Sequence, residues 1–177
     1  MNGLQETIIR PILCLSLAIV LLSSDVSNGQ ATTNLAAQIE WPGFNDAFTA
    51  AKKSKKIVLI DVWSSTCGWC RKQQTEVYTQ PDLQKFLFNK FELGRLNLDI
   101  TDDTLSFRGY TLSSQMLAGG LGATGTPTAV FMEADGAYIT RLQGFHAYED
   151  FYDVLRFIGS ESFREMSFEE FMAEPKK

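Results

Sequence analysis

Residues 57–70 read IVLIDVWSSTCGWC, and this stretch decides how the rest of the chain is interpreted. Its first half, Ile57 to Trp63, is a continuous run of β-branched and aromatic residues around one carboxylate, as is typical of a strand covered on both faces. Three hydroxyl residues follow, and Cys67 and Cys70 then stand three positions apart where a helix is expected to start. A C-x-x-C pair between a strand and a helix is typical of a reactive dithiol.

The place of the pair predicts a different role for each cysteine. Free N–H groups and the dipole at a helix N-terminus stabilise a thiolate, which is the nucleophile, so Cys67 is expected to attack. Cys70, one turn further on, is expected to resolve the mixed disulfide. Residues three apart in a regular helix have Cβ atoms about 5–6 Å apart, whereas a disulfide needs about 3.5–4.5 Å. The pair can therefore close only if Cys67 lies at the irregular start of the helix.

Cysteine usage favours reactivity over stabilisation. The third cysteine, Cys14, lies in an N-terminal apolar run. A bridge between Cys67 and Cys70 closes a very small loop and restricts the unfolded chain little. A structural zinc site needs about four ligands, whereas the chain after the expected signal peptide offers two thiols and one histidine, His146. An inert bridge and a zinc site are the weaker alternatives, and we expect no metal and no cofactor beyond the disulfide itself.

The N-terminal residues predict export. Arg10 precedes an uncharged apolar run at residues 11–22, and small and polar residues follow as far as Gly29. This is the layout of a secretory signal peptide, and the run is shorter than the roughly 20 residues that span a bilayer. An uncleaved anchor is the alternative. The expected organisation is a signal peptide at 1–29, an N-terminal arm at 30–42 and one domain at 43–177, located in the periplasm or secreted.

Length and charge narrow the class of protein further. The chain has 177 residues and a net charge of −5, so one domain of ordinary size can bury its own core. A mildly acidic chain without a basic patch argues against nucleic acid as a partner. We expect a monomer.

Periodicity along the chain predicts alternating helices and strands. Helices are expected at 43–55, 71–79, 82–88, 113–118 and 147–158, and strands at 57–63, 91–98, 128–132 and 137–143. Residues 101–110 are polar and turn-rich, and a last helical turn is expected at 167–172. This order predicts an α/β sandwich around a mixed sheet.

Three motifs taken together resemble thioredoxin. They are Asp61-Val62-Trp63, Cys67-Gly68-Trp69-Cys70 and Gly125-Thr126-Pro127-Thr128, in this order and at about the spacing of that family. Arg95 to Asp99 and Gly144 extend the likeness over roughly residues 57–158. The chain thus resembles the thioredoxin-like superfamily, and within it the secreted bacterial proteins of the SoxW type.

The resemblance implies a thioredoxin-like fold, with a central mixed β-sheet flanked by helices on both faces. An N-terminal extension and an insertion before the cis-proline strand, between Asp99 and Leu121, are departures from thioredoxin. Thr66 stands where thioredoxin has Trp before the first cysteine, and Trp69 stands where it has Pro. Both changes alter the contact surface and the surroundings of the thiols.

Asp61 is a candidate catalytic residue because it lies inside a strand that should be buried. An unpaired buried carboxylate costs several kcal/mol, so it must pair or take a proton. The family places a buried acid here, which implies a proton acceptor for Cys70. The alternative is a structural salt bridge to Lys55, Lys56 or Arg95.

Three residues are candidates for binding the partner chain. The resemblance implies a cis bond before Pro127, which would turn the Thr126 backbone toward Cys67 to hold an extended segment. Trp69, between the cysteines, would offer an apolar contact, with local packing as the alternative. His146 is interpreted as a capping or exposed residue, and Trp41 and Trp63 as core.

The function predicted from these observations is thiol–disulfide exchange by an exported enzyme, in the direction of reduction. Partners would be protein thiols and disulfides, and a thiol-electron donor in the membrane would return the enzyme to its dithiol form. An oxidase or isomerase of the same fold is the main alternative. A metal-handling chaperone of this fold is less well supported, because it would normally use a C-x-x-x-C pair with a placed histidine. A redox-inert binding module is also less well supported, because both cysteines, Asp61 and Pro127 are present together.

Overall fold

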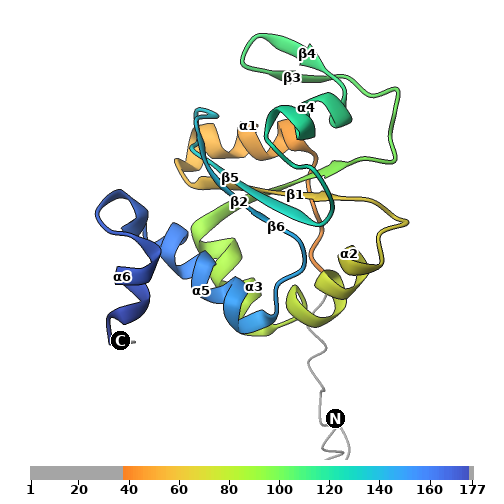
Figure 1. The fold of residues 1–177 in the computed structure, drawn as a ribbon. Helices are drawn as coiled ribbons and strands as arrows, with labels where there is room; N and C mark the ends of the chain where they lie inside the picture. Colours follow the sequence, from red (N-terminus) through yellow and green to blue (C-terminus); the bar gives the residue numbers. More distant parts are fainter. Residues whose placement is uncertain (1–37, 176–177) are drawn as a thin grey trace, which may run out of the picture. The chain divides into compact units, whose positions relative to one another are not determined.

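The strand predicted at 57–63 lies in the middle of a four-stranded sheet. The computed structural model describes residues 38–175, and the order of its main sheet is β2-β1-β5-β6 (Figure 1). The strands are β1 (Ile57–Trp63), β2 (Phe91–Asn97), β5 (Thr128–Met132) and β6 (Tyr138–Gln143). β1 runs parallel to β2 and antiparallel to β5, and β5 pairs antiparallel with β6. The expected mixed sheet is therefore confirmed.

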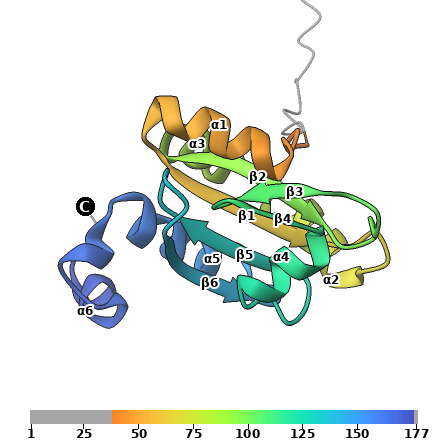
Figure 2. The ribbon, with the colours of Figure 1, turned by 90° about the horizontal axis from the view of Figure 1, so that it is seen from above.

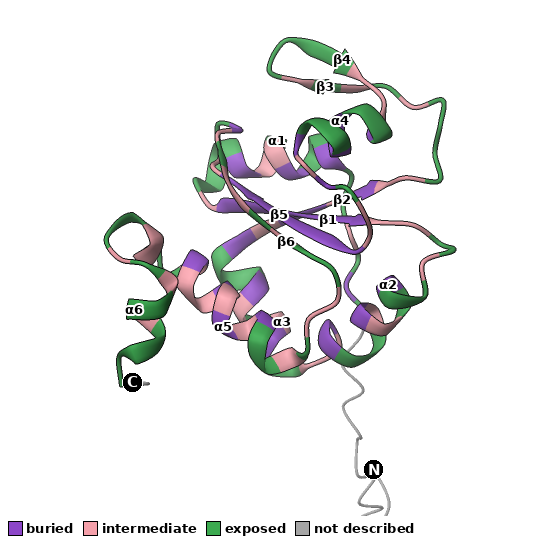
Figure 3. Ribbon diagram, viewed as in Figure 1, coloured by how far each residue is buried: buried purple, intermediate pink, exposed green. Residues whose placement is uncertain are grey.

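Helices cover both faces of this sheet, as the apolar run in β1 requires. One face carries α1 (Phe44–Ser54) and α4 (Ser114–Gly120), and the other carries α3 (Pro81–Lys90) and α5 (Tyr148–Gly159) (Figure 1). Side chains alternate along a strand, so Ile60 packs toward α1 while Leu59 packs toward α5. Both are fully buried, as is most of the central pair of strands (Figure 3).

The close approach of α1 to the sheet depends on a glycine in β2. An ideal Cβ at Gly94 would lie 2.6 Å from Ile60 Cδ1 and 2.7 Å from Ala47 Cβ. Carbon atoms pack at about 3.5–4.0 Å, so only glycine fits between the helix and the strand. This contact fixes the position of β2, which provides Arg95 on its opposite face.

The segment after β1 is helical but not one regular helix. α2 (Gly68–Lys72) continues into η1 (Gln73–Val77), a π-helical turn, instead of the single helix predicted at 71–79. π-Helical turns occur mostly within α-helices and frequently at functional sites. Pro81 then occupies the first turn of α3, where its missing N–H has no intrahelical partner to lose.

The predicted insertion lies outside the main sheet. β3 (Leu105–Phe107) and β4 (Tyr110–Leu112) form a separate two-stranded sheet, which α4 follows. Viewed from above, this hairpin lies beside α1 (Figure 2), and Phe107 contacts Phe44 with ring centroids 5.3 Å apart. The short helix is as predicted, whereas the hairpin was not predicted.

The chain before α1 is tied to the edge of β2. The Arg95 N–H donates to the carbonyl of Pro42 at 2.9 Å, and Gly43 forms a parallel bridge with Arg95. Ile39 is buried. The end of the predicted arm is therefore attached to the sheet through Pro42 and Gly43. The expected signal peptide and the start of the arm lie outside the described residues.

After α5 the chain forms two short elements, η2 (Ser162–Arg164) and α6 (Phe168–Ala173). Ser167 and Glu170 form a reciprocal capping box at the start of α6. Phe157 of α5 contacts Phe168 and Phe171, which holds α6 against α5. None of the helices within residues 38–175 has the length and apolar character that crossing a membrane requires.

Candidate active site

The two cysteines of the C-x-x-C motif form a disulfide at the start of α2. Cys67 is the N-cap residue and has an extended backbone, and its Cα lies 5.2 Å from that of Cys70. The Cys67 Sγ accepts a hydrogen bond from the Cys70 N–H at 3.0 Å. Cys70 is buried, whereas Cys67 is half-buried. The pair closes because Cys67 lies outside the regular helix, as the spacing argument requires.

The loop that leads into Cys67 is held by Asp99, which follows β2. The Asp99 carboxylate accepts from Ser64 Oγ at 2.6 Å and from the Ser65 N–H at 2.7 Å. These hydrogen bonds, that from Ser64 first, hold the pKa of Asp99 below its ordinary value. The Cys67 N–H in turn donates to the Ser64 carbonyl at 3.2 Å. The network therefore connects the end of β2 to the first cysteine.

Asp61 is buried on the α5 side of the sheet and is paired. Arg95 Nε and Nη2 both donate to its Oδ2, at 2.9 and 2.7 Å, and the Tyr78 hydroxyl donates to its Oδ1 at 3.4 Å. Burial raises the pKa of Asp61, and Arg95 and Tyr78 oppose that rise. Burial also raises the pKa of Tyr78, with a further contribution from the Asp61 charge. Of the three cations considered for a salt bridge, Arg95 is the one that forms it.

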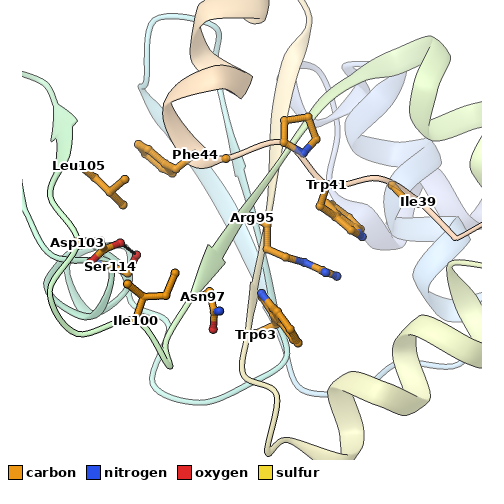
Figure 4. Close-up of a pocket in the computed structure, with 12 residues that line it drawn as sticks. Ile39, Trp41, Phe44, Trp63, Arg95, Asn97, Ile100, Asp103, Leu105 and Ser114 are labelled. Carbon is orange, nitrogen blue, oxygen red and sulfur yellow. Dashed lines mark hydrogen bonds between the residues drawn. The ribbon is translucent and has the colours of Figure 1, made fainter.

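The guanidinium of Arg95 lies between two tryptophan rings. It is 4.7 Å from the ring centroid of Trp41 and 4.6 Å from that of Trp63, and Figure 4 shows the two rings on either side of it. Both tryptophans are only half-buried and line a cavity of about 450 Å³ next to the insertion. They are therefore not the plain core residues expected from the sequence.

Trp69 lies beside the loop that contains Thr126. Together with Gly144 and Phe145, these residues line a groove of about 240 Å³. Trp69 is 59% exposed, and its ring is 5.5 Å from that of Phe145. The Thr126–Pro127 peptide bond is cis, Pro127 is buried, and its carbonyl accepts from the Gly144 N–H at 2.8 Å. The chain between the cysteines and the chain before Pro127 thus share one depression.

A cation borders this groove. Lys72 Nζ lies 4.8 Å from the Phe145 ring centroid and 5.3 Å from that of Trp69. Sequence reasoning missed Lys72 and Phe145, although Phe145 directly follows the glycine that matches the family.

His146 lies outside the groove-lining set. Its backbone N–H donates to the Gln73 side chain at 3.4 Å, and its ring nitrogen Nε2 lies 3.1 Å from the Gln143 carbonyl. Within residues 38–175, no three His, Cys, Asp or Glu side chains gather to hold a metal ion.

Fold and site define an α/β protein with a C-x-x-C disulfide at the start of the helix that follows the central strand. The profile of the thioredoxin-like domain family matches residues 44–159, and the chain belongs to this family. A comparison with curated proteins finds no match.

Solved structures agree on the fold. A thioredoxin from Thermus thermophilus is 24% identical with a TM-score of 0.57, over 69% of this chain and 88% of its own. A thioredoxin-fold protein from Helicobacter pylori is 21% identical with a TM-score of 0.56, and the match covers 67% of this chain and 78% of that protein. The DsbH oxidoreductase is 21% identical with a TM-score of 0.52, and the match covers 71% of this chain and 90% of that protein.

Proposed function

We propose that this protein is an exported thiol–disulfide oxidoreductase that reduces disulfides in other proteins. The observation that supports this best is the Cys67–Cys70 disulfide, with the half-buried cysteine at the helix start and the buried cysteine a turn behind it. A helix start stabilises the thiolate that attacks. The buried partner is protected from other oxidants until the mixed disulfide has formed.

In the proposed reaction, the Cys67 thiolate attacks one sulfur of the partner's disulfide. A bond forms between Cys67 Sγ and that sulfur, and the other partner sulfur leaves as a thiolate. Cys70 then loses its proton, and its sulfur attacks Cys67 Sγ and displaces the second partner thiolate. The partner gains two electrons and, with two protons, becomes a dithiol, while the protein becomes the disulfide form seen in the structure.

Asp61 is proposed to take the proton from Cys70 in the second step. Its burial and its raised pKa favour proton uptake, while the ion pair with Arg95 keeps the unprotonated form accessible. A base that works near neutral pH needs a pKa close to that range. Asp61→Asn should therefore slow release of the partner more than the first attack, whereas equal slowing of both steps would contradict this role.

The groove between Trp69 and Thr126 is proposed to receive the partner chain. The backbone of Thr126 would form β-type hydrogen bonds with an extended segment, and Trp69 would contact an apolar side chain beside the partner's cysteine. Export is supported by the N-terminal sequence, and a membrane thiol-electron donor would then supply the reducing equivalents.

Trapping and a redox titration together test the proposal. Cys70→Ala should accumulate mixed disulfides with partner proteins through Cys67, whereas Cys67→Ala should not. Equilibration of the wild-type protein with a glutathione buffer gives the reduction potential of the Cys67–Cys70 pair. Proteins of this fold span roughly −270 to −120 mV, and about 30 mV is a tenfold change in equilibrium. A value near −270 mV supports reduction, and one near −120 mV would show an oxidase instead.

A further inference from the structure

Trp41 contacts both groups that hydrogen-bond to Asp61. Its ring lies 4.7 Å from the Arg95 guanidinium, and its centroid is 5.0 Å from that of Tyr78 in an edge-to-face arrangement. Arg95 and Tyr78 donate to different oxygens of the Asp61 carboxylate. Trp41, which lies in the segment before α1, therefore contacts both side chains that donate hydrogen bonds to the Asp61 carboxylate.

The backbone fixes Trp41 in this place. The carbonyl of the next residue, Pro42, accepts from the Arg95 N–H, and Gly43 bridges to the same residue. Trp41 is thus anchored to the strand position whose side chain it stacks on. Figure 4 shows Arg95 extending between the rings of Trp41 and Trp63.

Stacking decides where the guanidinium points. An arginine side chain has several rotatable bonds, but its planar group stacks well on aromatic faces. With Trp41 on one face and Trp63 at 4.6 Å on the other, the guanidinium keeps its edge free. That edge makes the two hydrogen bonds to Asp61 Oδ2. Without one of the rings, the guanidinium can rotate toward the adjoining cavity.

We propose that Trp41 is a positioning residue for Asp61, which acts by holding the Arg95 guanidinium against the carboxylate. The groups that act on Asp61 come from two sides. Arg95 opposite it on β2 supplies the charge, and Tyr78 at the end of η1 supplies a hydroxyl. On its other side, β5 places the apolar Ala129 opposite Asp61. Trp41 contacts both polar groups and so controls how strongly the ionised form is favoured.

The primary measurement is the pKa of Asp61 in the oxidised protein, determined by NMR of the labelled carboxyl carbon as the pH is varied. Trp41→Leu should raise this pKa, because a freed Arg95 stabilises the ionised form less. The free energy of one cation–π contact sets the upper bound on this effect, an increase of about threefold in the ratio of protonated to ionised Asp61. Trp41→Phe keeps an aromatic face and should shift the ratio much less. Phe163 is a half-buried aromatic residue that packs against α5. The matched control Phe163→Leu should therefore leave the pKa of Asp61 unchanged.

A double-variant cycle tests the route through Arg95. Arg95→Lys keeps the charge but removes the planar group, so Trp41→Leu should have less than half its effect in that background. An unchanged Asp61 pKa in Trp41→Leu, or equal shifts in both backgrounds, would overturn the proposal. Should Trp41→Leu fail to fold, Trp41→Tyr and Trp41→Met provide the aromatic and non-aromatic pair for the same comparison.

The inference about rate rests on the proposed function and is measured separately. A chromogenic aromatic thiol attached to Cys67 is released when Cys70 attacks, and the rate of release is followed against pH. The profile should move to higher pH in Trp41→Leu, by the shift found for Asp61. A shifted pKa with an unshifted profile would refute Asp61 as proton acceptor but leave Trp41 as its positioning residue. An unshifted pKa would refute the positioning role, whatever the enzyme's activity.

Discussion

Replacing Gly94 by alanine tests the packing that places β2 beside β1. The added Cβ would lie 2.6 Å from Ile60 Cδ1 and 2.7 Å from Ala47 Cβ. Ile60 is fully buried, so its side chain cannot turn into solvent, and the Cβ of Ala47 is fixed to the backbone of α1. Relief therefore requires that the helix and the strand separate.

The size of this separation sets the expected loss of stability. Restoring ordinary carbon contacts of about 3.5 Å requires a movement of roughly 0.8 Å between α1 and β2. Overpacking of this kind costs about 1–3 kcal/mol of the free energy of unfolding. For a chain of this size, 1 kcal/mol corresponds to about 2–4 °C in Tm, so a loss of roughly 2–12 °C is expected.

Thermal and urea unfolding of the oxidised protein, followed by circular dichroism, measure the change. Gly120→Ala is the matched control, because an ideal Cβ there meets nothing within 4 Å and the residue lies in α4. Because Gly120 is the last residue of α4, this change should raise the free energy of unfolding by no more than about 0.5 kcal/mol. Ile60→Val removes the Cδ1 contact, so Gly94→Ala should cost less in that background. A loss below about 0.5 kcal/mol for Gly94→Ala, or strict additivity with Ile60→Val, would refute this account of the packing.

Three other changes probe the core, the loop before Cys67 and the groove. Leu155→Ala removes a fully buried side chain of α5 and should cost about 2–5 kcal/mol in urea unfolding. Because hydrogen bonds hold the pKa of Asp99 low, its contribution to stability is present above a carboxyl's ordinary pKa and is lost as the pH falls through the lowered one. Asp99→Asn should therefore lower Tm at pH 7 more than at pH 2, and equal losses at both would contradict the assignment. Phe145→Ala removes the ring beside Trp69 and should raise KM for a disulfide partner several-fold, with kcat and Tm little changed; a fall in kcat alone would argue against a binding role.

The strands of the main sheet were predictable because their signal is local. β1 and β5 have the predicted bounds, since each is a short apolar run between turn-forming residues. The β3–β4 hairpin was not predicted, because its strands are three residues long and separated only by Arg108 and Gly109. Both of these residues have positive φ, as a type I′ two-residue turn requires. An Asn-Gly or Asp-Gly pair would have indicated the turn, whereas Arg-Gly did not.

The surroundings of Asp61 were only partly predictable. Its burial follows from its place in the strand, and Arg95 was among the cations considered for pairing. The contribution of Tyr78 depends on the π-helical turn before it, for which the sequence has no known signal. Trp41 contacts the two donors to Asp61, Arg95 and Tyr78, from a segment that the bridge between Gly43 and β2 holds in place, and this long-range contact is not contained in the sequence periodicity.

The pairing of the arm with β2 also bears on how copies of this protein avoid one another. β2 is an outer strand of the sheet, and an uncovered outer strand offers free N–H and C=O groups to any other extended chain. The carbonyl of Pro42 and the bridge at Gly43 occupy that side at Arg95. Loss of the residues before Phe44 would open this side to strand addition by a second molecule. The short segment that contacts the donors to the buried carboxylate thus also covers part of this outer strand.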